Sequence, residues 1–219
     1  MRGFIIAVAV GLLTSMAPAA HADMQKDIDQ AVAIIESFQK IAEQAIPRAV
    51  FREAKGLAII TVTKGGFIVT GRGGTGVLIA RTENGWSGPS AIGMGGVGFG
   101  FQAGAQVSEL VIVLNTPAAV DAFSKGGNVT LGGSLSLAAG PVGRDAEASL
   151  TLGAAVYTYS RSQGLFGGLS LEGTVIGARD EVNAEYYGKP VTPAEILSGQ
   201  VQPPAGAEEL KEAITKYGA

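Results

Sequence analysis

Hydrophobic and small residues alternate with a period of two in the middle of the chain. From Val97 to Val107 the odd positions are valine, phenylalanine or alanine, whereas the even positions are glycine or glutamine. This alternation is typical of a β-strand with two different faces. Because glycine has no side chain to pack, a glycine-lined face indicates close approach of another backbone or a tightly bent sheet. The pattern predicts one crowded face formed by Gly98, Gly100 and Gly104.

Further strands are predicted before and after this stretch. Glycine clusters separate the apolar runs Leu57–Val62, Phe67–Thr70 and Val77–Arg81, and Glu83-Asn84-Gly85 predicts a tight hairpin turn. From Asn128 to about Tyr187, leucine alternates with serine and threonine in several short segments with turn signals between them. This spacing favours antiparallel strands over βαβ units.

Residues 23–44 have the pattern of an amphipathic helix. Apolar residues, among them Ile28, Ile35 and Phe38, recur at helical spacing on one side, and Lys26 and Glu36 avoid that stripe. We expect the stripe to pack on the sheet, because stripes at this spacing usually face a core. Insertion of the stripe into a lipid bilayer is the alternative.

Four shorter helices follow from local start and stop signals. One is expected over 47–55, ended by Gly56, and one after the cap residue Thr116, ended by Gly126. A capping box from Thr192 to Glu195 starts the third, and the last covers 208–217. Together with the strands, these helices predict an α+β fold. Its mainly antiparallel, glycine-rich sheet is curved or barrel-like, with an N-terminal amphipathic helix and short C-terminal helices.

Composition agrees with a packed domain rather than a disordered or fibrous chain. The 219 residues are 47% hydrophobic and 16% charged, and the 33 glycines show no three-residue period. We divide the chain into a signal peptide over 1–22, one domain over 23–200, and a C-terminal helical tail over 201–219.

The first 22 residues have the features of a secretory signal peptide. Arg2 precedes an apolar run, and Ala20-His21-Ala22 gives the small-x-small cleavage pattern. The apolar run is too short for a confident membrane span, although an uncleaved anchor is the alternative. With no cysteine, the protein has no disulfide and no cysteine-linked lipid. The sequence therefore predicts a periplasmic or secreted protein, cleaved after Ala22.

Few kinds of catalytic chemistry are open to this chain. The predicted mature part has neither histidine nor cysteine, which excludes histidine-based triads and zinc sites built on those ligands. Two GxGxxG matches, Gly71–Gly76 and Gly93–Gly98, run into predicted strands rather than opening helices, so a dinucleotide site is rejected. A hydrolase using carboxylates such as Glu109 or Asp145 remains an alternative. We predict no enzymatic activity, no cofactor and no metal.

The net charge of −3 and the lack of a basic run argue against nucleic acid as a partner. Several of the few basic residues, Arg81 among them, lie at turns and strand ends. An arginine beside the exposed amides of a glycine-rich turn can hold a phosphate. Ordinary surface charge is the alternative interpretation. The candidate lipid-headgroup-binding residues are Lys64, Arg72, Lys125, Arg144 and Arg161.

Six sequence blocks, taken together and in their order, resemble the SYLF domain and cover nearly the whole predicted mature chain. They are Lys55–Ile60, Gly71–Gly76, Trp86–Gly93, Gln106–Val111, Gly140–Arg144 and Gly164–Gly173. In eukaryotes this domain occurs beside SH3 or FYVE modules, binds phosphoinositide membranes and in some members binds actin. Bacterial relatives are stand-alone exported proteins, some of them lipid-anchored.

The resemblance implies a non-enzymatic lipid- or phospholipid-binding protein that acts at a membrane surface of the bacterial envelope. The implied partner is an anionic phospholipid or a membrane surface. The alternative is a structural or protein-interaction module of the periplasm, whose glycine-lined surfaces accept a strand or helix from a protein partner.

Overall fold

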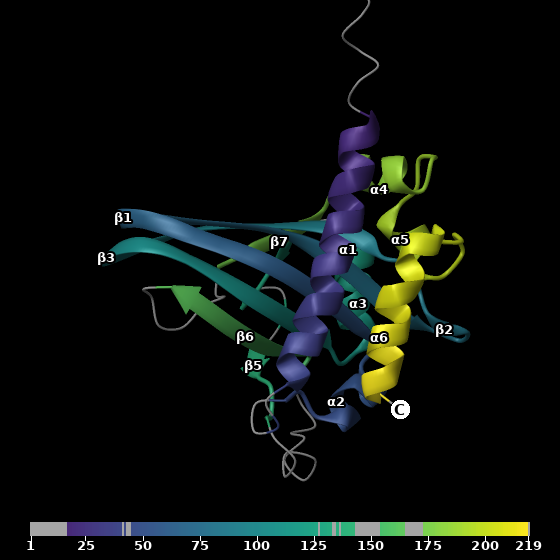
Figure 1. The fold of residues 1–219 in the computed structure, drawn as a ribbon, viewed down its shortest axis with the longest axis horizontal. Coiled ribbons are helices and arrows are strands. Elements are labelled where there is room, and N and C mark those ends of the chain that lie inside the picture. The colour runs from purple at the N-terminus through teal and green to yellow at the C-terminus, as the bar shows by residue number, and fades with distance from the viewer. Residues whose placement is uncertain are drawn as a thin grey trace, which may run out of the picture.

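The structure is a computed structural model. It describes residues 17–40, 42, 45–126, 128–132, 135, 137–142, 154–164 and 173–218. A long N-terminal helix crosses a curled sheet, and the shorter helices lie toward one end of that sheet, to the right in Figure 1. This α+β arrangement, with its curled and mostly antiparallel sheet, N-terminal helix and short C-terminal helices, confirms the predicted fold class.

Seven strands form one sheet in the described part of the chain. Their bounds are β1 Gly56–Thr82, β2 Gly85–Trp86, β3 Ser90–Leu114, β4 Val129–Thr130, β5 Leu137–Ala139, β6 Val156–Gly164 and β7 Val175–Ala178. β1 and β3 pair antiparallel along almost their whole length, with a β-bulge between Gly66 and Ile68. The later half of β3 pairs with β6, and its first residues pair with β7. β5 and β6 form a parallel pair, which the antiparallel prediction did not include.

The prediction of three separate strands before the first hairpin is wrong. The glycine clusters at 65–66 and 71–76 lie inside one 27-residue strand, β1. Glycine weakens an isolated strand, but here continuous pairing with β3 supplies the hydrogen bonds on one edge of the strand. Both GxGxxG matches lie inside β1 and β3, so neither opens a helix, as predicted.

The two halves of β1 fold back toward one another and meet along a seam. The backbone N–H of Arg81 donates to the carbonyl of Lys55 at 2.8 Å. A β-carbon on Gly74 would lie 3.2 Å from Cα of Val62, and one on Gly76 would lie 2.8 Å from Cα of Ile60. Close approach of another backbone, expected from the glycine pattern, therefore occurs at these two glycines. The surroundings of Gly98, Gly100 and Gly104 lie outside the described residues.

Helices lie on both sides of the sheet. They are α1 Ala17–Gln39, α2 Arg48–Glu53, α3 Pro117–Ser124, α4 Asp180–Tyr186, α5 Pro193–Leu197 and α6 Glu208–Gly218, with a short 3₁₀ helix η2 over Ala205–Ala207. The predicted caps are present: the hydroxyl of Thr116 accepts from the N–H of Ala119, and Thr192 and Glu195 form a capping box. α4 was predicted as part of a strand region, but pairing of β7 with β3 ends at Ala178 and the chain turns into a helix.

Two apolar cores result, one on each face of the sheet. The outer core joins α1, α2, α4 and α6 to odd-numbered strand residues such as Ile59, Val77 and Val111. The inner core joins α3 and Leu197 of α5 to even-numbered strand residues such as Ile60, on the face enclosed by the curl. Since apolar side chains pack on both faces, much of the sheet is buried.

Candidate binding surfaces

A two-stranded ribbon projects from the body of the molecule. We define it as residues 63–75 of β1 and 95–107 of β3, which pair with one another and extend to the left in Figure 1. At its base the ribbon still contacts the body of the molecule, since Thr75 donates to Asp27 of α1. Val97 and Val107 on this ribbon are 75% and 46% exposed, and a side chain added at Gly71 or Gly95 would meet open space. The ribbon therefore offers an apolar, side-chain-poor surface that the helices do not cover.

The ribbon also has an unusual charge. Its two segments contain Lys64 and Arg72 but no aspartate or glutamate, although the whole chain has a net charge of −3. Both cations occupy even positions of β1, on the same face of the strand, and both are partly exposed. The side chain of Arg72 lies over Gly96, where Nε would be 3.0 Å from an added β-carbon. The structure thus brings two of the five predicted headgroup-binding residues onto one projecting element.

The other predicted residues lie elsewhere. Lys125 is exposed at the C-terminal end of α3, outside the ribbon. Arg161 belongs to β6, where its Nη1 donates to the carbonyl of Ser37 and its guanidinium carbon lies 5.6 Å from the centre of the Phe38 ring. Arg161 therefore attaches the C-terminal end of α1 to the sheet. Arg144 lies outside the described residues.

The apolar stripe of α1 is buried. Ile28 and Ile35 have no exposed surface and Phe38 is 4% exposed, because all three belong to the outer core. The expectation that the stripe packs on the sheet is confirmed, and its insertion into a bilayer is excluded in this conformation. No helix in the described part of the chain is long and apolar enough to cross a membrane.

A buried acid on α1 was missed from the sequence. Asp27 is 5% exposed; its carboxylate accepts a hydrogen bond from Thr75 at 2.8 Å and forms an ion pair with Arg179 at 2.9 Å. Burial raises the pKa of the Asp27 carboxyl, although Thr75 and Arg179 both oppose that rise. The sequence contains the pattern that could have identified it. Asp27 stands next to Ile28 in the apolar stripe, and a carboxylate buried there needs a hydrogen-bond or ion-pair partner.

Glu109, one of the acids considered for carboxylate chemistry, joins two elements of the fold. The carboxylate of Glu109 accepts a hydrogen bond from the Ser37 hydroxyl at 3.0 Å, which joins β3 to α1. Asp145 lies outside the described residues. In the part of the chain that the structure covers, no group of three or more His, Cys, Asp or Glu residues could hold a metal ion.

Comparison with known proteins shows to which family the chain belongs. Residues 95–217 match the family model described as "Ysc84: Las17-binding protein actin regulator". The SH3 domain-containing YSC84-like protein 1 of Bos taurus is 45% identical over 203 residues, which are 89% of this chain and 60% of the relative. The human protein of the same name is 45% identical over 203 residues, covering 59% of its own length.

A fungal relative shows the same level of similarity. LAS seventeen-binding protein 3 of Saccharomyces cerevisiae is 45% identical over 197 residues, which are 85% of this chain and 43% of the relative. The chain thus spans about 60% of the length of the first of these relatives. The family description refers to Las17 binding and actin regulation, and the yeast name refers to binding. The predicted resemblance is confirmed, and the chain belongs to the Ysc84 family, whose shared module is the SYLF domain.

Proposed function

We propose that this chain is a non-enzymatic binding module that docks on anionic phospholipid membranes through the ribbon. The observation that carries the proposal is the ribbon itself, which projects beyond the helices, exposes Val97 and Val107 on one face, has two cations on the other face, and contains no acid. Apolar side chains can enter the interfacial region of a bilayer, and each nearby lysine or arginine contributes about 1 kcal/mol toward an anionic surface.

The proposed location is a membrane surface of the bacterial envelope, reached by export. Its support is the signal-peptide pattern over 1–22, with cleavage expected after Ala22. Cleavage there would remove residues 17–22 from the start of α1, before Met24, the first residue of the outer core. Mass spectrometry of the exported protein should therefore find Asp23 at its N-terminus.

Vesicle co-sedimentation over a salt series tests the docking proposal. The wild-type protein should bind vesicles of phosphatidylglycerol and phosphatidylcholine at low salt, and binding should weaken as salt screens the charges. The double variant Lys64→Gln/Arg72→Gln should bind about 30-fold more weakly, because two basic contributions of about 1 kcal/mol are lost. Val97→Asp should also weaken binding by placing an acid on the exposed apolar surface.

Lys40→Gln serves as a matched control, because Lys40 is exposed at the end of α1 and lies outside the ribbon. It should bind as the wild type does. If the folded double variant binds anionic vesicles as tightly as the wild type and salt has no effect, docking through the ribbon is refuted.

A protein-binding module is the second candidate. It is favoured by the family description and the name of the yeast relative, which both refer to Las17 binding. The ribbon could accept a strand or helix from a protein partner, since a β-carbon at Gly71 or Gly95 would meet nothing within 4 Å. Failure of the protein to bind vesicles of any composition, with the fold intact, would favour this second candidate.

A further inference from the structure

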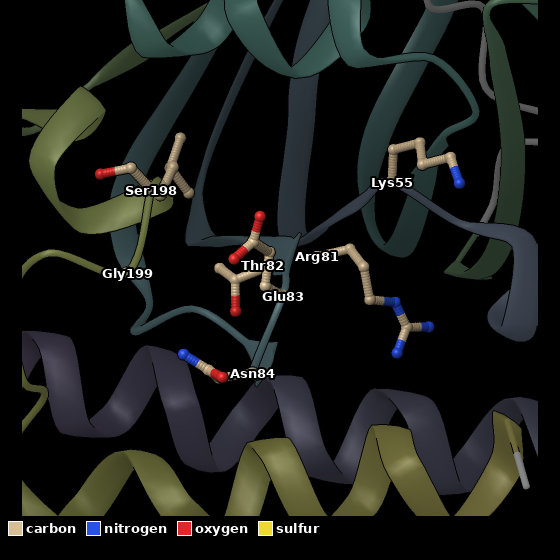
Figure 2. A pocket seen from close by; sticks show the side chains of 8 residues that line it. Lys55, Arg81, Thr82, Glu83, Asn84, Ser198 and Gly199 are labelled. Carbon is tan, nitrogen blue, oxygen red and sulfur yellow. The ribbon is translucent and has the colours of Figure 1, made fainter.

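A groove lies at the end of the sheet opposite the ribbon. It is formed between the turn that follows α5 and the hairpin that joins β1 to β2, and has a volume of about 580 Å³. Figure 2 shows its lining from close by. The lining residues are Lys55, Arg81, Thr82, Glu83, Asn84, Leu197, Ser198 and Gly199. Only Leu197 among them has an apolar side chain, so the groove suits a polar ligand.

Two cations form one side of this groove, where Figure 2 shows their side chains lying on the same side. The backbone of Lys55 is fixed at the seam, because its N–H donates to Leu114 at 2.8 Å and its carbonyl accepts from Arg81 at 2.8 Å. Among the described residues, the side chain of Lys55 has no hydrogen bond or ion pair. Its ammonium group is therefore available to a ligand.

Arg81 is held in place by its own contacts. Its Nη2 donates to the carbonyls of Phe51 at 2.9 Å and Arg52 at 3.4 Å, and its guanidinium carbon lies 4.0 Å from the centre of the Trp86 ring. Nε and Nη1 make no hydrogen bond to any described residue. The guanidinium is thus oriented in advance and retains donors for an anionic oxygen, which lowers the entropic cost of binding.

An acid lies away from the two cations. Glu83 is exposed in the hairpin turn, and no ion pair within 4.0 Å joins it to Lys55, Arg81 or another described residue. On the far side Gly199 lies close to Thr82, since a β-carbon added at Gly199 would be 3.2 Å from Cγ2 of Thr82. The groove therefore presents separated charges of both signs, none of them in an ion pair with a described residue.

We propose that this groove binds a small zwitterionic ligand with a phosphate group at one end and an ammonium group at the other. Lys55 and Arg81 hold the phosphate, and Glu83 accepts hydrogen bonds from the ammonium. A simple anion would gain from the two cations but would be repelled by Glu83, whereas a zwitterion satisfies both ends of the groove. Phosphoethanolamine has this chemistry, both as a free solute and as the headgroup of phosphatidylethanolamine.

Isothermal titration calorimetry with phosphoethanolamine, inorganic phosphate and ethanolamine tests the proposal. The wild-type protein should bind phosphoethanolamine saturably and at least about tenfold more tightly than either half of the ligand. Lys55→Gln and Glu83→Gln should each weaken that binding about tenfold, because each removes one charged contact. Lys40→Gln, an exposed lysine outside the groove, should leave the affinity unchanged. Circular dichroism establishes that each variant is folded.

The proposal is overturned if phosphoethanolamine shows no saturable binding, if Lys55→Gln binds it as tightly as wild type, or if Glu83→Gln binds it more tightly. A second arm separates the two sources, using vesicles of phosphatidylethanolamine and phosphatidylcholine without anionic lipid. Vesicle binding that depends on Lys55 assigns the lipid headgroup, whereas binding of the solute alone assigns the free compound. Since the soluble assay contains no membrane, its outcome is independent of docking through the ribbon.

Discussion

The strongest stability prediction concerns the seam where the two halves of β1 meet. A β-carbon on Gly76 would lie 2.8 Å from Cα of Ile60 and still closer to the carbonyl oxygen of Ile59. Non-bonded heavy atoms are normally about 3.5 Å or more apart. The obstructing atoms belong to the backbone of the same strand, so no side chain can rotate away, and Gly76→Ala requires the two halves of β1 to separate.

The magnitude follows from two opposing effects. Overpacking a buried site costs about 1–3 kcal/mol, and the upper end applies here because the contact is with paired backbone. Replacing glycine by alanine also lowers the conformational entropy of the unfolded chain, which stabilises the folded state by about 0.4–1 kcal/mol. The net expectation is a destabilisation of about 2 kcal/mol, or a fall in Tm of about 4–8 °C for a domain of this size.

Thermal unfolding followed by circular dichroism measures the effect, with Gly95→Ala as the matched control. Gly95 also lies in a long strand of the same sheet, but a β-carbon there would meet nothing within 4 Å. The control should be as stable as the wild type or slightly more stable. If Gly76→Ala has the same Tm as Gly95→Ala, the two halves of β1 are not packed as tightly as described, and the reasoning fails.

Two further predictions concern the attachment of α1. Burial raises the pKa of Asp27 above its ordinary value of 3.8, so the folded protein binds this proton more tightly than the unfolded chain does. The contribution of Asp27 to the free energy of unfolding therefore falls as the pH rises from 3.8 through the raised pKa. Urea unfolding should therefore show the stability of Asp27→Asn increasing relative to that of the wild type as the pH rises through this window. A relative stability that decreases instead would show that the ion pair with Arg179 outweighs the effect of burial. Arg161→Ala should lower the free energy of unfolding by about 1–3 kcal/mol and leave vesicle binding unchanged, whereas exposed Lys125→Ala should stay within about 0.5 kcal/mol. If Arg161→Ala lost vesicle binding but kept its stability, Arg161 would be a membrane-binding residue rather than one that holds α1.

The sequence predicted well those features that depend only on residues close together in the chain. Thr116 and Thr192 cap helices as expected, because a cap depends on hydrogen bonds within one turn. The amphipathic period of α1 correctly identified its buried side, although the helix ends at Gln39 rather than at residue 44. The period-two alternation identified β3, since the two faces of a strand follow directly from the order of its residues.

What the sequence left open was decided by contacts between distant segments. Glycine clusters in β1 indicated breaks because local propensity opposes glycine in strands, but pairing with β3 outweighed that preference. Of the predicted headgroup residues that the structure describes, only Lys64 and Arg72 share one element, and Arg161 holds α1 to the sheet. The groove joins Lys55 and Arg81 to a turn after α5, more than a hundred residues away, so no local pattern could have shown it.

The sequence by itself therefore determined the helix caps, the buried side of α1, the two faces of β3, and the family to which the protein belongs. The curl of the sheet determined the rest, because it closes β1 on itself, projects the ribbon at one end and forms the groove at the other. The physical reason is that periodicity fixes the direction of each side chain relative to its own backbone, whereas the neighbours it meets depend on long-range packing.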